Sequence, residues 1–238
     1  MRTWRFRPGF AMTAATIAFC ALTVALGLWQ TRRASEKEAL QARVERLGAE
    51  RPLALPTRPV APGDYALHRV VARGAYADRF TILLDNRVHR GRPGFHVLSP
   101  LRIAGGNVHV LVNRGWIAAG RTRAELPEVA TPAGEQTVEG LATVPAARVY
   151  ELTADTVEGR VWQNLLLDRY RAWSKLELQP IVIQQTNDAG DGLAREWDRP
   201  DAGADRHRAY ALQWFSLAAL AVVLYVVLNL KRSARGGS

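Results

Sequence analysis

The chain has 238 residues, of which 48% are apolar, a single cysteine and a formal net charge of +10. This length and composition exclude a disordered or fibrous protein and predict one globular domain at most. The lone Cys20 excludes an intramolecular disulfide and a paired-cysteine metal site. Six basic residues stand in the two acid-free tails, at Arg2, Arg5, Arg7, Lys231, Arg232 and Arg235. The middle of the chain therefore lacks a concentrated basic surface, and we expect no nucleic-acid partner.

Two uncharged apolar segments, residues 10–28 and 209–230, stand near the ends of the chain. At about 1.5 Å per residue they reach roughly 28 and 33 Å as helices, enough to cross a hydrocarbon core of roughly 30 Å. The first segment is longer than the h-region of a signal peptide, about 7–15 residues, and no small-x-small cleavage site follows it. The sequence therefore predicts two uncleaved transmembrane helices in a lipid bilayer.

The basic tails predict the orientation, because Lys and Arg are retained on the cytoplasmic side of membrane spans. Both termini are expected in the cytoplasm and the central domain on the other side. Arg32 and Arg33 lie on the opposite flank, but long translocated domains escape this charge rule. No amphipathic presequence precedes the first span. A bacterial plasma (inner) membrane, with a periplasmic central domain, is the predicted location.

The segment between the spans begins with a helical stalk, in which Leu40, Val44 and Leu47 form an apolar stripe, and continues as a proline-rich connector. Short β-rich runs separated by turn residues follow, at 67–74, 80–85, 95–103, 108–113, 136–144 and 180–186, with a helix at 165–176. This spacing favours a mainly antiparallel β-barrel or sandwich over a parallel sheet. The predicted fold class is therefore an α+β membrane protein, with N- and C-terminal transmembrane helices flanking this β domain.

The predicted organisation has six parts. They are a cytoplasmic basic tail at 1–9, a transmembrane helix at 10–28, the stalk and connector at 29–64, an extracytoplasmic β-rich domain at 65–208, a second transmembrane helix at 209–230, and a cytoplasmic basic tail at 231–238.

Enzymatic motifs are missing: the sequence has no Gly-x-Ser-x-Gly, no His-Glu-x-x-His, no phosphate loop and no dinucleotide fingerprint. We therefore predict no catalytic residues and no enzyme. His96 and His109 fall on two strands that pair if they are neighbours, which leaves open a membrane-anchored sensor or enzyme with a ligand site across the sheet.

The sequence Asn113-Arg114-Gly115-Trp116 is expected to end a strand in a turn. Two interpretations stay open. The four residues are purely structural, or Arg114 and Trp116 face lipid headgroups or a protein partner.

The start of the second span carries the most suggestive pattern, because helical spacing places His207, Tyr210 or Ala211, and Trp214 on one face. An ordinary interfacial aromatic belt with a solvated histidine explains this pattern. The alternative is a haem site, since neutral imidazole is a common axial ligand of haem iron and aromatic rings suit the porphyrin.

The first span leaves the membrane where the second enters it. We therefore expect the Trp29-Gln30 pair to lie at the same depth as the Gln213-Trp214 pair.

Four blocks of sequence resemble the surfeit locus protein 1 family, also called the Shy family. They are GLWQTRR at 27–33, LLDNRVHRGRPGFHVLSPL at 83–101, VLVNRGW at 110–116 and HRAYALQWF at 207–215. The blocks occur in the family's order and extend from the first span to the second.

The resemblance implies an assembly factor for cytochrome c oxidase that turns over no substrate and assists haem a delivery to, or stabilisation of, oxidase subunit I. It implies subunit I and other oxidase assembly proteins as partners. His207 matches the family's candidate ligand of haem iron, with Trp29, Gln30, Tyr210, Gln213 and Trp214 as candidate neighbours. A membrane scaffold that binds subunit I but no haem is the alternative function.

Overall fold

The computed structural model describes residues 4–120, 125–146, 157–197 and 203–232. Residues 1–3 and 233–238 of the predicted basic tails lie outside the described residues. The chain divides into two compact units. One unit holds residues 1–42 and 199–238, and the other holds residues 43–198.

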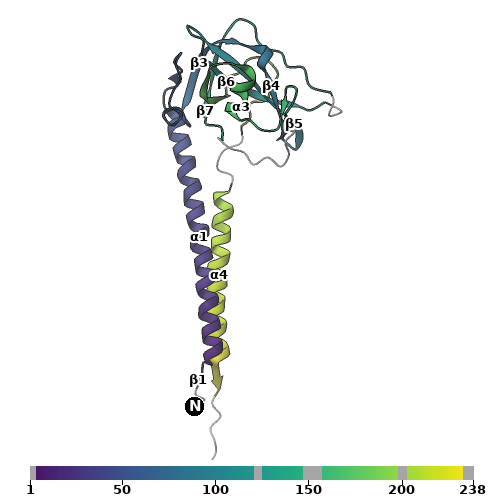
Figure 1. The fold of residues 1–238 in the computed structure, drawn as a ribbon. Coiled ribbons are helices and arrows are strands. Elements are labelled where there is room, and N and C mark those ends of the chain that lie inside the picture. The colour runs from purple at the N-terminus through teal and green to yellow at the C-terminus, as the bar shows by residue number, and fades with distance from the viewer. Residues whose placement is uncertain (1–3, 121–124, 147–156, 198–202, 233–238) are drawn as a thin grey trace, which may run out of the picture. The chain divides into compact units, whose positions relative to one another are not determined.

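The first unit is a pair of long helices that lie side by side (Figure 1). Helix α1 runs over Phe10–Ala49 and helix α4 over Ala204–Asn229. Each contains an apolar window long enough to cross a membrane. The α1 residues that turn inward recur at alternating spacings of three and four, as they do in left-handed helix pairs.

Small side chains allow the two helices to approach closely, as is usual between membrane helices. In α1 the buried positions include Thr23, Gly27 and Ala34, and in α4 they include Ala211 and Ala218. A Cβ atom on Gly27 would lie 2.6 Å from the Phe215 ring, so a larger residue here would require that ring to move. The apolar leucines and valines of both helices are left facing outward, as a lipid environment requires.

The second unit is built around a closed barrel of five strands. These are β3 (Arg69–Tyr76), β7 (Glu135–Thr143), β10 (Leu178–Gln185), β6 (His109–Ala118) and β5 (Arg92–Ile103), and pairing of β3 with β5 closes the barrel. All neighbours in the barrel are antiparallel except β10 and β6. Strand β4 (Ile82–His89) extends the sheet beyond β5.

Successive side chains along each strand point alternately into the barrel and away from it. Inward side chains from all five barrel strands form one fully apolar cluster that includes Val70, Leu101, Val110, Val138 and Ile183. Each such side chain contributes about 1.5–3 kcal/mol when it is fully buried. The intervening residues face outward.

Helix α3 (Leu167–Ser174) covers part of the outer face of the barrel. Tyr170 is fully buried there and donates a 2.6 Å hydrogen bond to the Phe80 carbonyl. Burial raises the pKa of Tyr170. Its ring and that of Trp162 both pack edge-on against Trp173 and are tilted against each other, so aromatic contacts hold this layer in place.

The short elements complete the two units. They are the strands β1 (Trp4–Phe6), β2 (Leu53–Ala54), β8 (Val157–Glu158), β9 (Val161–Trp162) and β11 (Leu230–Arg232), the helix α2 (Pro62–Tyr65) and the 3-10 turn η1 (Asp78–Phe80).

The two membrane helices, the six longer strands and the helix near residue 170 predicted from the sequence are all present, and the predicted fold class is confirmed. The chain reverses at Arg90 and Gly91, both at positive φ, and Pro93 and Gly94 already belong to β5.

Barrel closure depends on a glycine, because a Cβ atom on Gly74 would lie 1.8 Å from the Arg102 carbonyl oxygen. We expect Gly74→Ala to lower the free energy of unfolding by about 3 kcal/mol, the upper range for overpacking. Gly63 is the matched control, because a Cβ atom placed on it would have nothing within 4 Å. Urea unfolding of both variants in mild detergent measures the difference. Equal effects at Gly74 and Gly63 would contradict this account of closure.

Candidate functional site

His207 lies on the first turn of α4 and contacts α1. Its Nδ1 atom is 2.6 Å from Oε1 of Gln30. An amide oxygen can only accept a hydrogen bond, so Nδ1 carries a proton, and in the neutral imidazole Nε2 then keeps its lone pair. Within the described part of the chain, no residue bonds Nε2. The contact with Gln30 therefore favours the tautomer that can bind a metal through Nε2.

Polar side chains surround this contact at the end of the helix pair. Arg208, the next residue of α4, forms a 2.7 Å ion pair with Glu38 of α1. Both partners are exposed, so the pair is worth less than about 1 kcal/mol. One turn below Glu38, Ala34 is buried between the helices and keeps them close. The ring of His207 is half-buried and held at a polar edge of an otherwise apolar pair.

The predicted depth of the aromatic residues is wrong. The structure places Gln30 level with His207, and Cys20 contacts the Ala218 carbonyl further along the pair. Gln213 and Trp214 come six and seven residues after His207, roughly 9–10 Å deeper at 1.5 Å per residue. The Trp29-Gln30 pair and the Gln213-Trp214 pair therefore do not share one level.

The candidate neighbours of His207 also do not all face the same side of the helix pair. Trp214 is half-buried and follows the inward face that contains Ala211. Tyr210 is 48% exposed and Trp29 is 52% exposed, so both rings face the surroundings of the helix pair. Gln213 is exposed as well. Of the residues proposed from the sequence, Gln30 alone has a hydrogen bond to His207 in the described structure.

In the second unit, the Asn113–Trp116 sequence lies within β6 and does not end it. The Arg114 side chain is completely buried. Its guanidinium donates to Asp191 at 2.8 Å, to the Ala130 carbonyl at 2.6 Å and to Thr131 at 3.1 Å, and it lies 5.1 Å from the Tyr76 ring centroid. The interpretation in which Arg114 faces headgroups or a partner is therefore wrong.

Asp191 is the residue that sequence reasoning missed in this network. It also accepts a 2.6 Å hydrogen bond from Arg195. Desolvation by burial raises the pKa of Asp191, but the hydrogen bonds and charges of Arg195 and Arg114 outweigh it, and the net pKa is lowered. Asp191 stands in a glycine-rich segment typical of turns, and its spacing of four from Arg195 is the one signal that pointed to a pair.

The other three residues of the Asn113–Trp116 stretch help to hold neighbouring segments against β6. A Cβ atom on Gly115, whose φ is +147°, would lie 2.7 Å from the Ala194 carbonyl oxygen. Glycine at this position therefore allows the segment that contains Ala194 to pack closely against β6. Trp116 donates a 2.7 Å hydrogen bond to the Arg87 carbonyl and its ring lies 5.0 Å from the His89 ring. Asn113 is buried and lies 3.3 Å from the His96 ring nitrogen. All four residues thus have structural roles.

The alternative ligand site across His96 and His109 is wrong. His96 lies opposite Trp116, whereas His109 lies opposite Arg102, six residues further along β5. At about 3.3 Å per residue this separates the two imidazoles by roughly 20 Å. Their strands are neighbours, as expected, but the register keeps the two histidines apart.

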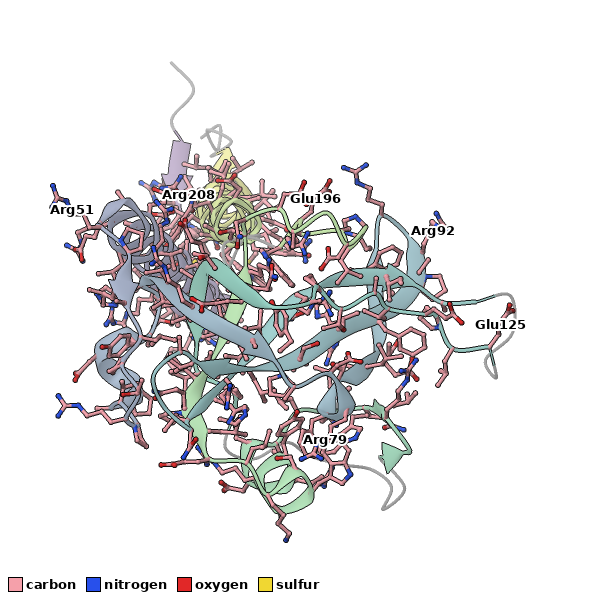
Figure 2. All side chains as sticks on the ribbon, turned by 90° about the horizontal axis from the view of Figure 1, so that it is seen from above. Arg51, Arg79, Arg92, Glu125, Glu196 and Arg208 are labelled. Atoms are coloured by element: carbon pink, nitrogen blue, oxygen red, sulfur yellow. The ribbon has the colours of Figure 1, made fainter. Side chains whose placement is uncertain are left out.

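Two arginine–carboxylate pairs in the second unit allow a controlled test of burial. Arg114 and Asp191 are buried, whereas Arg90 pairs with the exposed Glu196, seen in Figure 2 on the same edge of the domain as Arg92. We expect Arg114→Met to lower the free energy of unfolding by about 3–5 kcal/mol, because Asp191 is left buried without its partner. Arg90→Met should cost less than about 1 kcal/mol.

Urea unfolding followed by tryptophan fluorescence measures both values. Adding Asp191→Asn to Arg114→Met should restore part of the loss, since it removes the uncompensated charge. A loss no larger for Arg114→Met than for Arg90→Met would contradict the buried network.

His109 predicts a pH dependence of stability. It is 8% exposed, and desolvation lowers its pKa below the usual value. Protonation therefore favours the unfolded chain. The stabilisation is complete above about pH 6.5 and is lost as the pH falls through the lower folded-state pKa. In His109→Gln, the slope of unfolding free energy against pH below about 6.5 should be smaller than in the parent protein. An unchanged slope in urea unfolding would contradict this role.

Comparisons with known proteins place these features in context. A model of the SURF1 family matches residues 17–219, from within α1 to within α4. The chain is similar to a SURF1-like protein of Monosiga brevicollis, 24% identical over 94% of this chain and 89% of the relative. It is 26% identical to a SURF1-like protein of Rickettsia felis, over 87% and 91% of the two chains. Surfeit locus protein 1 of Takifugu rubripes is 24% identical over 89% and 94%.

Proposed function

Since the chain belongs to the SURF1 family, whose members are known as oxidase assembly factors, we propose that it assists haem a delivery to subunit I of cytochrome c oxidase, or stabilises subunit I during maturation. Subunit I and other oxidase assembly proteins are its proposed partners. It acts as a carrier or chaperone and turns over no substrate.

The contact between His207 and Gln30 carries the proposal. A haem ligand must be a neutral imidazole with a free nitrogen lone pair, and its other nitrogen usually donates to an oxygen acceptor that orients the ring. The Gln30 oxygen supplies the acceptor for Nδ1, and in the neutral imidazole this leaves Nε2 as the free nitrogen. The residues present therefore fit an axial ligand of haem iron.

The surroundings of His207 also fit a porphyrin. Tyr210, one turn along α4, and Trp29, beside Gln30 on α1, leave about half of their surfaces open. Aromatic faces of this kind pack against planar ring systems. Bound haem would supply the iron that His207 ligates, while Gln30 holds the proton at Nδ1 and keeps the imidazole from turning.

A site on the outer face of a helix pair also suits release. One imidazole and exposed rings hold a ligand less firmly than an enclosed site with two imidazoles, so a final acceptor could withdraw it. This balance is what a carrier requires.

We place the protein in a bacterial plasma membrane with both termini cytoplasmic and the β domain periplasmic. Support comes from the two apolar helices, the basic residues at the ends of the chain, and the Rickettsia relatives.

The test is a redox difference spectrum of the full chain, purified in mild detergent from cells that make haem a. We expect a haem a signal in the parent protein and its loss in His207→Ala, because the axial ligand is removed. His96→Ala is the matched control, since His96 lies in the β domain and is expected to leave haem content unchanged.

Two variants of Gln30 test whether this residue positions the His207 ring through its hydrogen bond or only packs against it. Gln30→Leu should weaken haem binding by about 10–100-fold, the usual effect of removing the partner of a metal-binding histidine. Gln30→Glu keeps an accepting oxygen and should retain the parent spectrum.

If the parent protein carries no haem in cells that make haem a, the scaffold function is favoured, and co-purification of subunit I becomes its test. Equal haem content in the parent protein and His207→Ala would rule out His207 as the ligand.

A further inference from the structure

The first unit carries a small β-ribbon at the ends of both membrane helices. Strand β1 pairs antiparallel with β11, and Arg5 stands opposite Lys231 in the register. The ribbon continues into the helices, because the Arg7 amide donates a 2.9 Å hydrogen bond to the Asn229 carbonyl. It thus joins the residues before α1 to the residues after α4.

Contacts with the helix ends fix the ribbon in place. The Phe6 ring packs edge-on against Tyr225 at 5.8 Å, and Tyr225 hydrogen-bonds Thr13 at 2.6 Å. Asn229 is buried and donates to the Tyr225 carbonyl and to the Met12 sulfur. Since these contacts lie where both apolar spans end, the ribbon lies at the level of the lipid headgroups.

No acidic residue stands near this ribbon in the sequence to balance its positive charge. Residues 1–35 and 206–238 contain no aspartate or glutamate. Arg5 and Arg7 are exposed, and within the described residues no carboxylate pairs with them. The two exposed arginines are therefore left as positive charge that an external anion can neutralise, and a two-stranded ribbon is marginal by itself.

We propose that the ribbon binds the phosphates of anionic phospholipid headgroups in the adjacent leaflet. Guanidinium groups match phosphate oxygens in two parallel hydrogen bonds, and phosphate bound by Arg5 and Arg7 neutralises their charge. Binding and ribbon formation are thereby coupled. The site does not depend on haem binding, so its failure would leave the proposed assembly function intact.

The experiment compares the full chain in nanodiscs of phosphatidylcholine with nanodiscs that also contain phosphatidylglycerol. The variant is Arg5→Gln with Arg7→Gln. The matched control is Arg51→Gln with Arg58→Gln, which removes two exposed arginines from the β domain, Arg51 being visible at its surface in Figure 2. Native mass spectrometry measures the lipid retained, and hydrogen exchange measures protection of residues 4–7.

The parent protein and the control should retain phosphatidylglycerol in preference to phosphatidylcholine. The Arg5/Arg7 variant should lose about 25-fold of that preference, since each of the two basic residues near a membrane is worth about fivefold. Exchange of residues 4–7 in the parent should be slower with phosphatidylglycerol present.

Three outcomes would overturn the proposal. They are no lipid preference in the parent protein, an equal loss in the control, and equal protection of residues 4–7 by inorganic phosphate in phosphatidylcholine discs, which would assign the site to free phosphate.

Discussion

A polar side chain carried by a membrane helix needs a hydrogen-bond partner inside the helix pair, and the Gln30–His207 contact is the result of this constraint. Small residues on either side of it along α1, among them Gly27 and Ala34, bring the helices close enough for the two side chains to meet. The contact selects one imidazole tautomer and leaves Nε2 available. The candidate ligand chemistry of the protein thus depends on close helix packing as much as on the histidine.

The β domain meets the same requirement with charges. Arg114 is buried beside the barrel, where an unpaired cation would cost several kcal/mol, and Asp191 compensates it. Because Asp191 belongs to the segment that returns over β6, the pair attaches that segment to the barrel. Gly115 gives the segment room to approach. Arg114 and Gly115 therefore form a structural fastening and not a docking surface.

The two units differ in how far their polar and aromatic side chains are exposed. In the helix pair, the half-buried His207 lies beside exposed aromatic rings, an arrangement suited to taking up and releasing a flat ligand. At the other end of the pair, Arg5 and Arg7 are exposed and have no carboxylate partner among the described residues. In the second unit, polar groups such as Arg114 and Tyr170 are buried and hydrogen-bonded, which suits a rigid body.

The sequence by itself determined the two long apolar helices and the six longer strands, because charge-free length and β-rich alternation are local properties. Only the tertiary structure decided which side chains meet. Helix offset set Gln30 opposite His207 and moved Trp214 deeper, and strand register separated His96 from His109. It also buried Arg114 against Asp191, 77 residues away. Such partners depend on how distant segments pack, and a local pattern carries no information about that packing.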